Sequence, residues 1–210
     1  MEPEYKPPRA PTKEEKKSHF GSDWRSALST IALFALAPIV ALLIAAFMMQ
    51  SYQVDGQSME TTLQNNDRLI VNKVPRTFSR LTHHAYIPRR GDIIIFNQSL
   101  DPGGSAAEKQ LVKRVIGLPG ERVVVDNGTI TVYNQQNPSG FNPDKSGKYL
   151  VSVDTTPRKI DLTLKINQLF VCGDNRANSE DSRFFGPVNL NKIVGKLSFR
   201  ILPLSKIHHY

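Results

Sequence analysis

The chain has 210 residues and a formal net charge of +8, from 27 basic and 19 acidic residues. Its single cysteine, Cys172, excludes an intramolecular disulfide, and none of its five histidines has the spacing to acidic or thiol residues that a metal site needs. We therefore expect no metal and no other cofactor, and we interpret Cys172 as a small buried residue at the end of a strand.

The first long apolar stretch runs over 27–49 and contains 23 residues without a charge. At about 1.5 Å per residue, a helix of this length crosses a hydrocarbon core of about 30 Å. The stretch is longer than the apolar core of a cleavable leader, and FMMQSYQ at its end offers no small-residue cleavage site. These features predict one transmembrane helix over 27–49 rather than a soluble core helix.

The segment before this stretch, 1–25, is basic and poor in apolar residues. Its basic residues are Lys6, Arg9, Lys13, Lys16, Lys17 and Arg25. Lys and Arg beside a span favour the cytoplasmic side, and acidic residues count for little in that rule. We expect a disordered cytoplasmic tail over 1–25 and an extracytoplasmic domain over 50–210.

The remaining residues are basic as well, with 21 basic against 14 acidic side chains. A basic domain tethered beside a bilayer can bind anionic membrane lipid, or the charge can belong to an ordinary solvated surface. The sequence leaves both interpretations open. Nucleic acid is not expected as a partner, because the domain lies outside the cytoplasm.

Beyond the predicted span, the apolar runs are short, rich in β-branched residues and separated by turn signals. They lie at 68–74, 91–96, 110–117, 121–125, 129–133, 149–153, 162–166, 168–172 and 193–202. Asp-Asn-Gly at 126–128, between two such runs, is a strong hairpin signal. We predict a mainly β fold, an antiparallel-sheet domain preceded by one transmembrane helix.

One part of this domain has a different composition. The stretch 134–160 is rich in Asn, Pro, Gly, Ser and Lys, which predicts an irregular excursion from the sheet. We therefore expect a smaller β subdomain, an appendage over about 122–168.

A serine, Ser58, follows the apolar stretch by nine residues, within SYQVDGQSMETTL. Gly56 permits a sharp backbone turn before it, and METTLQNN can form one short turn of helix. Ser58 is then either a nucleophile close to the membrane surface or a solvated or helix-capping residue. This segment alone does not decide between them.

A lysine, Lys113, interrupts the apolar run LVKRVIG at 111–117. In a strand its side chain shares a face with Leu111 and Val115, so its charged form is disfavoured. A lysine in an apolar pocket can lose 3 to 5 pKa units, as an order of magnitude, and then accept a proton from a serine. The alternative is that Lys113 extends along the strand edge with its amine in water.

A polar loop, CGDNRANSEDSRFFGPV, occupies 172–188 between two apolar stretches. Asp181 can pair with Arg183, and Asp174 with Arg176, which would give a rigid polar network in place of a solvated surface loop. Such a network would hold Ser179 and the lysine amine in fixed positions.

Four runs of the sequence, GQSMETTL, RGDIIIF, KRVIGLPGE and GDNRANSEDSR, occur in this order behind the predicted anchor. Together they resemble the bacterial type I signal peptidases (leader peptidases), membrane-anchored serine proteases that remove signal peptides from secreted preproteins. The resemblance spans roughly 27–200 and is weakest over 134–165. It implies an enzyme in the cytoplasmic membrane of a bacterium, which acts at the outer face through a serine–lysine dyad and an acyl-enzyme.

The resemblance also implies roles for individual residues. Ser58 matches the nucleophile and Lys113 the general base. The supporting residues are Ser179, which orients the lysine, the pair Asp181 and Arg183, and Arg114 after the lysine. The Ser58 backbone N–H matches one oxyanion donor, and the second is open between the Gly56 backbone and a water. Thr61 replaces a proline that is usual in the family.

Finally, the resemblance implies that the preprotein binds in extended form, by strand addition to two segments. The residues of these segments are Gln53, Val54, Asp55, Gln110, Leu111 and Val112. Met59, Leu63 and Val112 are expected to line shallow apolar pockets that admit small residues. Membrane lipid is a further expected partner, and binding to the secretion translocon is left open.

Three rival functions differ from this one in what they require of the sequence. The self-cleaving SOS repressors share a related core, but they need a DNA-binding domain where this chain has the predicted span. A catalytically silent binding module would have lost Ser58, Lys113 or Ser179, and all three are present. A dedicated processing protease with one substrate stays open.

Overall fold

The computed structural model describes residues 13–82, 85–99, 108–147, 149–151 and 158–210. Within it the chain forms two compact units, Met1–Ala46 and Phe47–Tyr210.

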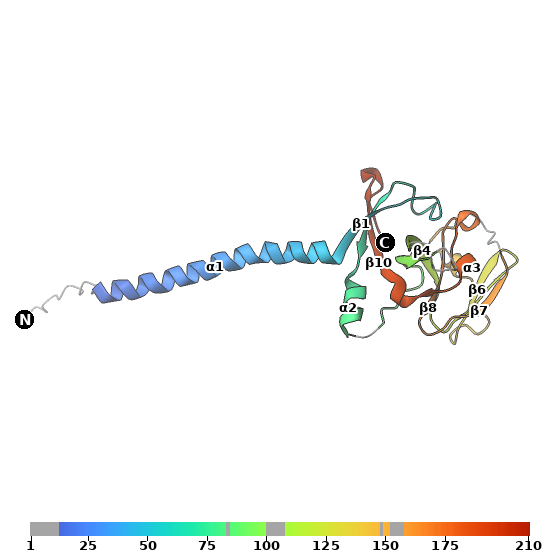
Figure 1. The fold of residues 1–210 in the computed structure, drawn as a ribbon, viewed down its shortest axis with the longest axis horizontal. Coiled ribbons are helices and arrows are strands. Elements are labelled where there is room, and N and C mark those ends of the chain that lie inside the picture. Colours follow the sequence, from blue (N-terminus) through green and yellow to red (C-terminus); the bar gives the residue numbers. More distant parts are fainter. Residues whose placement is uncertain (1–12, 83–84, 100–107, 148, 152–157) are drawn as a thin grey trace, which may run out of the picture. The chain divides into compact units, whose positions relative to one another are not determined.

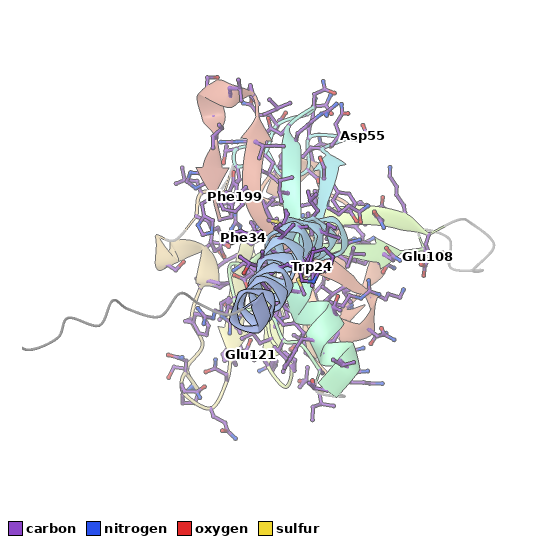
Figure 2. The ribbon with its side chains drawn as sticks, turned by 90° about the vertical axis from the view of Figure 1, so that its left-hand side faces the viewer. Trp24, Phe34, Asp55, Glu108, Glu121 and Phe199 are labelled. Atoms are coloured by element: carbon purple, nitrogen blue, oxygen red, sulfur yellow. The ribbon has the colours of Figure 1, made fainter. Side chains whose placement is uncertain are left out.

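The first unit holds most of helix α1 (Lys13–Met48), which contains Pro38. The helix includes 13–25 of the segment expected to be disordered, because KEEKK supplies strong helix formers there. The rest of that segment, 1–12, lies outside the described residues. Trp24 and Phe34 lie on α1 with exposed side chains (Figure 2). In the described part of the chain, no helix combines the length and apolar character needed to cross a membrane.

The second unit is built on an antiparallel sheet with the strand order β1-β2-β10-β3-β4-β8-β9, and β11 also pairs with β10. These strands are β1 (Met49–Gln53), β2 (Arg68–Asn72), β3 (Ile93–Gln98), β4 (Lys109–Gly117), β8 (Gln168–Cys172), β9 (Val188–Asn189), β10 (Ile193–Leu202) and β11 (His208–His209). All their pairings are antiparallel, which confirms the predicted sheet.

A second, smaller sheet has the order β6-β5-β7 and lies on the side of this unit opposite β1 (Figure 1). Its strands are β5 (Arg122–Asp126), β6 (Thr129–Tyr133) and β7 (Ile160–Thr163). Asn127 and Gly128 join β5 to β6 with positive φ values of 48° and 77°, which is the geometry of a two-residue hairpin turn. The predicted hairpin and the small appended sheet are therefore confirmed.

Short helical elements connect the strands. They are α2 (Val74–Thr82), η1 (Pro143–Ser146), η2 (Arg176–Asn178), α3 (Ser182–Phe185), η3 (Leu190–Lys192) and η4 (Leu204–Lys206), where η marks a 3₁₀ turn.

All but one of the predicted strands are present, with ends shifted by a few residues. The exception is 149–153, of which 149–151 are not in a strand and 152–153 lie outside the described residues. Tyr149 stacks against an arginine of β4 and Leu150 is 75% exposed, so this apolar run does not join a sheet. Three strands were not predicted, β1, β9 and β11, because each is polar or only two residues long.

β4 lies among three clusters of buried apolar side chains. Its Val115 belongs to one cluster and its Ile116 to a second, while the half-buried Val112 packs against the third. Cys172 is fully buried in the cluster that contains Ile116, which confirms that it is a core residue. The sheet thus holds β4 rigidly, and with it the two cations in its centre.

Candidate active site

Ser58 lies in a tight turn that follows β1. Gly56 has a φ of 102°, a conformation that favours glycine. The backbone N–H groups of Thr62 and Leu63 both donate to the carbonyl of Met59, at 2.9 and 2.8 Å, which forms the single helical turn expected from the sequence. Met59 and Leu63 are 1% and 0% exposed, so they anchor the turn in the core while Ser58 is half-buried.

Lys113 contacts this serine directly. Its Nζ lies 2.6 Å from Ser58 Oγ, although the two residues are 55 positions apart in the chain. Lys113 is only 3% exposed. Burial lowers the pKa of Lys113 to about 8, and the nearby carboxylate of Asp181 opposes that effect. The structure therefore joins a hydroxyl to an amine that can be neutral near physiological pH.

The carboxylate of Asp181 is the centre of a fully buried network. It accepts hydrogen bonds from Arg183 Nε and Nη2 at 2.7 Å, so the expected Asp181–Arg183 pair is present. It also accepts from Ser179 Oγ at 2.8 Å and from the backbone N–H of Gly173 at 2.9 Å. The hydroxyl of Ser179 is thus directed to Asp181, and that carboxylate in turn acts electrostatically on Lys113.

Gly173 is a site residue that the sequence did not reveal. A Cβ added there would lie 2.3 Å from both the Ser58 carbonyl oxygen and Ser179 Oγ. The loop after β8 can therefore pass against Ser58 only if position 173 lacks a side chain. Its one sequence signal is the glycine that directly follows the buried end of β8.

Arg114 lies on the other face of β4 from Lys113 and ties the same parts together. Its Nε and Nη2 donate to the two oxygens of Asp174, at 2.8 and 2.6 Å, and its Nη1 donates to the Gly91 carbonyl at 2.7 Å. Thr62, from the turn that carries Ser58, donates its hydroxyl to Asp174 at 2.5 Å. This cluster links β4, the turn that carries Ser58 and the loop after β8.

The expected pairing of Asp174 with Arg176 is wrong. Asp174 turns toward β4, where Arg114 neutralises it, whereas Arg176 turns toward the small sheet. Arg176 is 1% exposed and makes two contacts with the carboxylate of Asp144 in η1, of which Nη2 to Oδ1 measures 2.6 Å. Tyr149 donates its hydroxyl to the same carboxylate at 3.0 Å, and its ring lies 4.4 Å from the Arg114 guanidinium.

Asp144 and Tyr149 are further site residues that sequence reasoning missed. Both lie in the irregular stretch 134–160, where no local pattern indicates a distant partner. The stretch thus supplies a carboxylate to Arg176 and an aromatic ring to Arg114.

The two segments expected to bind substrate differ in their backbone pairing and in their exposure. Gln110, Leu111 and Val112 pair with β3, while the described pairing of β4 with β8 begins only at Arg114. Gln53 and Asp55 are exposed, and Asp55 lies at the edge of the domain (Figure 2).

Three other residues that were expected to contact substrate are buried in the core instead. Met59 and Leu63 were expected to line shallow pockets, but the turn directs both side chains into the core. Val54 is buried as well, and its backbone N–H donates to the Asp67 carbonyl. Of the three pocket residues, only Val112 keeps part of its surface exposed.

The backbone N–H of Gly56, one alternative for a second oxyanion donor, donates to Asn65 Oδ1 at 3.0 Å. A backbone N–H has one proton, so this bond removes it from the set of available donors.

Comparison with known proteins gives a consistent result. The family described as "Signal peptidase, peptidase S26" matches residues 27–202. Signal peptidase I of Leptolyngbya laminosa is 32% identical over 206 residues, which covers 96% of this chain and 90% of that protein. Signal peptidase I P of Bacillus subtilis subsp. natto is 32% identical over 199 residues, which covers 94% of this chain and 97% of that protein. A crystal structure of a signal peptidase I from Enterococcus faecalis V583 is 29% identical and covers 53% of this chain and 97% of its own, with a TM-score of 0.38.

Proposed function

The chain belongs to the signal peptidase family, peptidase S26, and from this premise we propose that it removes signal peptides from secreted preproteins with Ser58 as nucleophile and Lys113 as general base. The observation that carries the proposal is the 2.6 Å contact between Lys113 Nζ and Ser58 Oγ in a buried setting. Serine–lysine pairs of this kind activate a hydroxyl without histidine.

The lowered pKa makes the lysine usable as a base. At a pKa of about 8, roughly one lysine in ten is neutral at pH 7, against about one in 3,000 at the ordinary value of 10.5. A bound peptide would exclude further water from Lys113 and favour the neutral form more strongly. The network around Asp181 and Ser179 is proposed to hold the amine in place, as Arg183 and Arg114 hold the loops around it.

In the first half-reaction, neutral Lys113 takes the proton of Ser58 as Oγ bonds to the scissile carbonyl carbon. The carbonyl π electrons move to its oxygen, which becomes an oxyanion that accepts a hydrogen bond from the Ser58 backbone N–H. The C–N bond then breaks, and the lysine ammonium gives its proton to the leaving amine, the new N-terminus of the mature protein. The signal peptide remains as an ester on Ser58.

In the second half-reaction, Lys113 takes a proton from a water molecule that attacks this ester. When the resulting tetrahedral intermediate collapses, Lys113 returns the proton to Ser58 Oγ, and the signal peptide is released as a carboxylic acid. One oxyanion donor is the Ser58 N–H. Because Gly56 N–H already donates to Asn65, a water is the favoured second donor.

The preprotein is proposed to bind in extended form against the β4 edge at 110–112 and the chain at 53–55. Among the described residues, β8 pairs with β4 only from Arg114 onward, which supports this proposal because a peptide can pair before that point as an added strand. Half-buried Val112 would then contact the small side chains next to the cleavage site.

The apolar stretch 27–49 and the basic residues before it support an anchor in the cytoplasmic membrane, with the catalytic unit at the outer face. Membrane lipid is then a partner alongside secretory preproteins. Contact with the secretion translocon is a further proposal, to which no particular residue is assigned.

Cleavage of a secretory preprotein by the full-length protein in detergent tests the proposal, with Ser58→Ala as the matched variant. We expect the wild type to release a mature chain cut after the signal peptide and the variant to be inactive. Cleavage of a single preprotein among several would favour the dedicated protease. No cleavage of any preprotein by folded wild type would favour the silent binding module.

A further inference from the structure

We infer that Asn175 is a positioning residue that fixes the peptide group between Gln57 and Ser58, and with it the direction of the Ser58 backbone N–H. The inference rests on the proposed function, because that N–H matters to the reaction only if Ser58 is the nucleophile. Asn175 lies in GDNRANSEDSR but has no part in the serine–lysine chemistry described above.

Asn175 contacts the nucleophile segment through two of its groups. Its side-chain Nδ2 donates to the backbone carbonyl of Gln57 at 3.2 Å. Its backbone N–H donates to the carbonyl of Ser58 at 3.1 Å. Two successive peptide groups, one on each side of the Ser58 Cα, are therefore held by a single residue of the loop after β8.

The first of these contacts controls where the Ser58 N–H points. A peptide group is planar, and in its trans form the C=O and N–H point in opposite directions. The peptide between Gln57 and Ser58 is trans. A donor on the Gln57 carbonyl therefore directs the Ser58 N–H away from Asn175, and a rotation of the peptide plane would break that hydrogen bond.

The turn itself restrains the peptide group between Gln57 and Ser58 only in part. The Gln57 carbonyl also accepts from the Glu60 N–H at 3.1 Å, within the same turn. However, Gly56 precedes this peptide at a φ of 102°, and a Cβ at Gly56 would meet nothing within 4 Å, so sterics on that side restrain the backbone little. The bond from Asn175 comes from a separate element and adds a restraint that the turn lacks.

The close approach of the two loops also explains Gly173. A side chain at Gly173 would lie 2.3 Å from the Ser58 carbonyl oxygen, the same oxygen that accepts the Asn175 N–H. The loop is thus shaped to bring its backbone and Asn175 against the nucleophile.

The chain offers a matched control in Asn178. Its Nδ2 donates at 3.3 Å to the side-chain Oε1 of Gln57, so it contacts the same residue but not the peptide group. Asn175→Asp and Asn178→Asp each replace an amide donor by a carboxylate in the same loop. Both retain the backbone N–H, and both add the same charge.

We would measure kcat, KM and their pH dependence for these variants with a preprotein substrate, using full-length protein whose folding is checked by circular dichroism. We expect Asn175→Asp to lower kcat about tenfold with KM changed less than about twofold, because one oriented hydrogen bond to the transition state is weakened. Asn178→Asp should stay within about twofold of wild type. The apparent pKa of the rate profile should shift in the same direction in both variants, because each adds one carboxylate to the same loop.

Two further measurements keep the test decisive. Asn175→Ala removes the same donor without adding charge and should show the same loss of kcat. A peptide aldehyde forms an adduct with Ser58 whose tetrahedral carbon bears an oxygen in place of the oxyanion. It should bind either Asn175 variant about tenfold more weakly than wild type.

Equal kcat values for folded Asn175→Asp and Asn178→Asp would overturn the inference while the proposed function stands. A loss confined to KM would overturn it as well. If the wild type does not cleave, or Ser58→Ala still does, the proposed function fails and the inference fails with it.

Discussion

Lys113 and Arg114 are adjacent cations at the centre of β4, and the two faces of the strand treat them in opposite ways. Arg114 donates to both oxygens of Asp174 and to the Gly91 carbonyl, and it stacks on Tyr149. Lys113 is equally buried, but the hydrogen bond described for its amine goes to the neutral hydroxyl of Ser58. The carboxylate with the largest effect on its pKa, Asp181, forms its ion pair with Arg183 instead.

This difference explains why one buried cation can stabilise the structure while its neighbour can act as a base. A buried cation that meets its carboxylate stays charged and holds the parts around it together. A buried cation without such a partner favours its neutral form and can act as a base. The same strand therefore carries the proposed base on one face and the support for the turn that holds Ser58 on the other.

The largest expected effect comes from Lys113→Met, which keeps the length and apolar stem of the side chain and removes the amine. We expect cleavage to fall by at least about 10³-fold, as for the loss of other members of a nucleophile–base unit. The free energy of unfolding at pH 7 should not fall, because the folded state no longer disfavours a protonated amine. Preprotein cleavage and urea denaturation measure the two quantities, and near-normal cleavage by the folded variant would contradict the assigned base.

Arg114→Met tests the opposite face of β4. It breaks the buried ion pair between Arg114 and Asp174, and removing one partner of such a pair costs about 3 to 5 kcal/mol of folding free energy. Cleavage should fall as well, because Thr62 and the nucleophile turn lose their anchor in β4.

Arg122→Met is the matched control for Arg114→Met. Arg122 pairs with Asp161 on the small sheet, but both side chains are about half exposed, so water already screens the pair. Urea denaturation should show almost no change for this variant. Equal loss of stability in the two variants would remove the distinction between buried and exposed pairs.

Asp144→Asn tests whether η1, the turn between β6 and β7, supports the loop after β8. It removes the counter-charge of Arg176, which is 1% exposed, while the amide oxygen can still accept one hydrogen bond. We expect a loss of about 2 kcal/mol in unfolding free energy and a smaller loss of cleavage than for Arg114→Met. An unchanged midpoint in urea would show that the ion pair between Asp144 and Arg176 does not stabilise the loop around Arg176.

The sequence predicted the parts of this arrangement that depend on local pattern. Alternation in LVKRVIG placed Lys113 and Arg114 on opposite faces, and the β-branched runs predicted most strands. It failed where a partner is distant and the pattern around it is irregular. Asp144 lies in such a stretch, so Arg176 was paired with its neighbour Asp174 instead. Met59 and Leu63 were placed at the surface because apolar residues beside a nucleophile suggest pockets, whereas burial is decided by the turn.

The effect most specific to Lys113 is the pH dependence of the rate. A base must be neutral, and the pKa of Lys113 is about 8, so kcat/KM should fall about tenfold for each unit of pH below 8 and level off above it. Asn178→Asp adds a carboxylate nearby and should raise the inflection only slightly.

The same pKa gives an independent measurement on the folded protein. Between pH 8 and the ordinary lysine value of 10.5, the unfolded chain binds a proton at position 113 that the folded chain does not. The contribution of Lys113 to stability therefore rises with pH across this window, and Lys113→Met should lack that slope. A rate that does not change between pH 6 and 9, together with equal slopes for wild type and Lys113→Met, would mean that Lys113 stays charged. The two faces of β4 would then be alike in their electrostatics, and the base would have to be sought elsewhere.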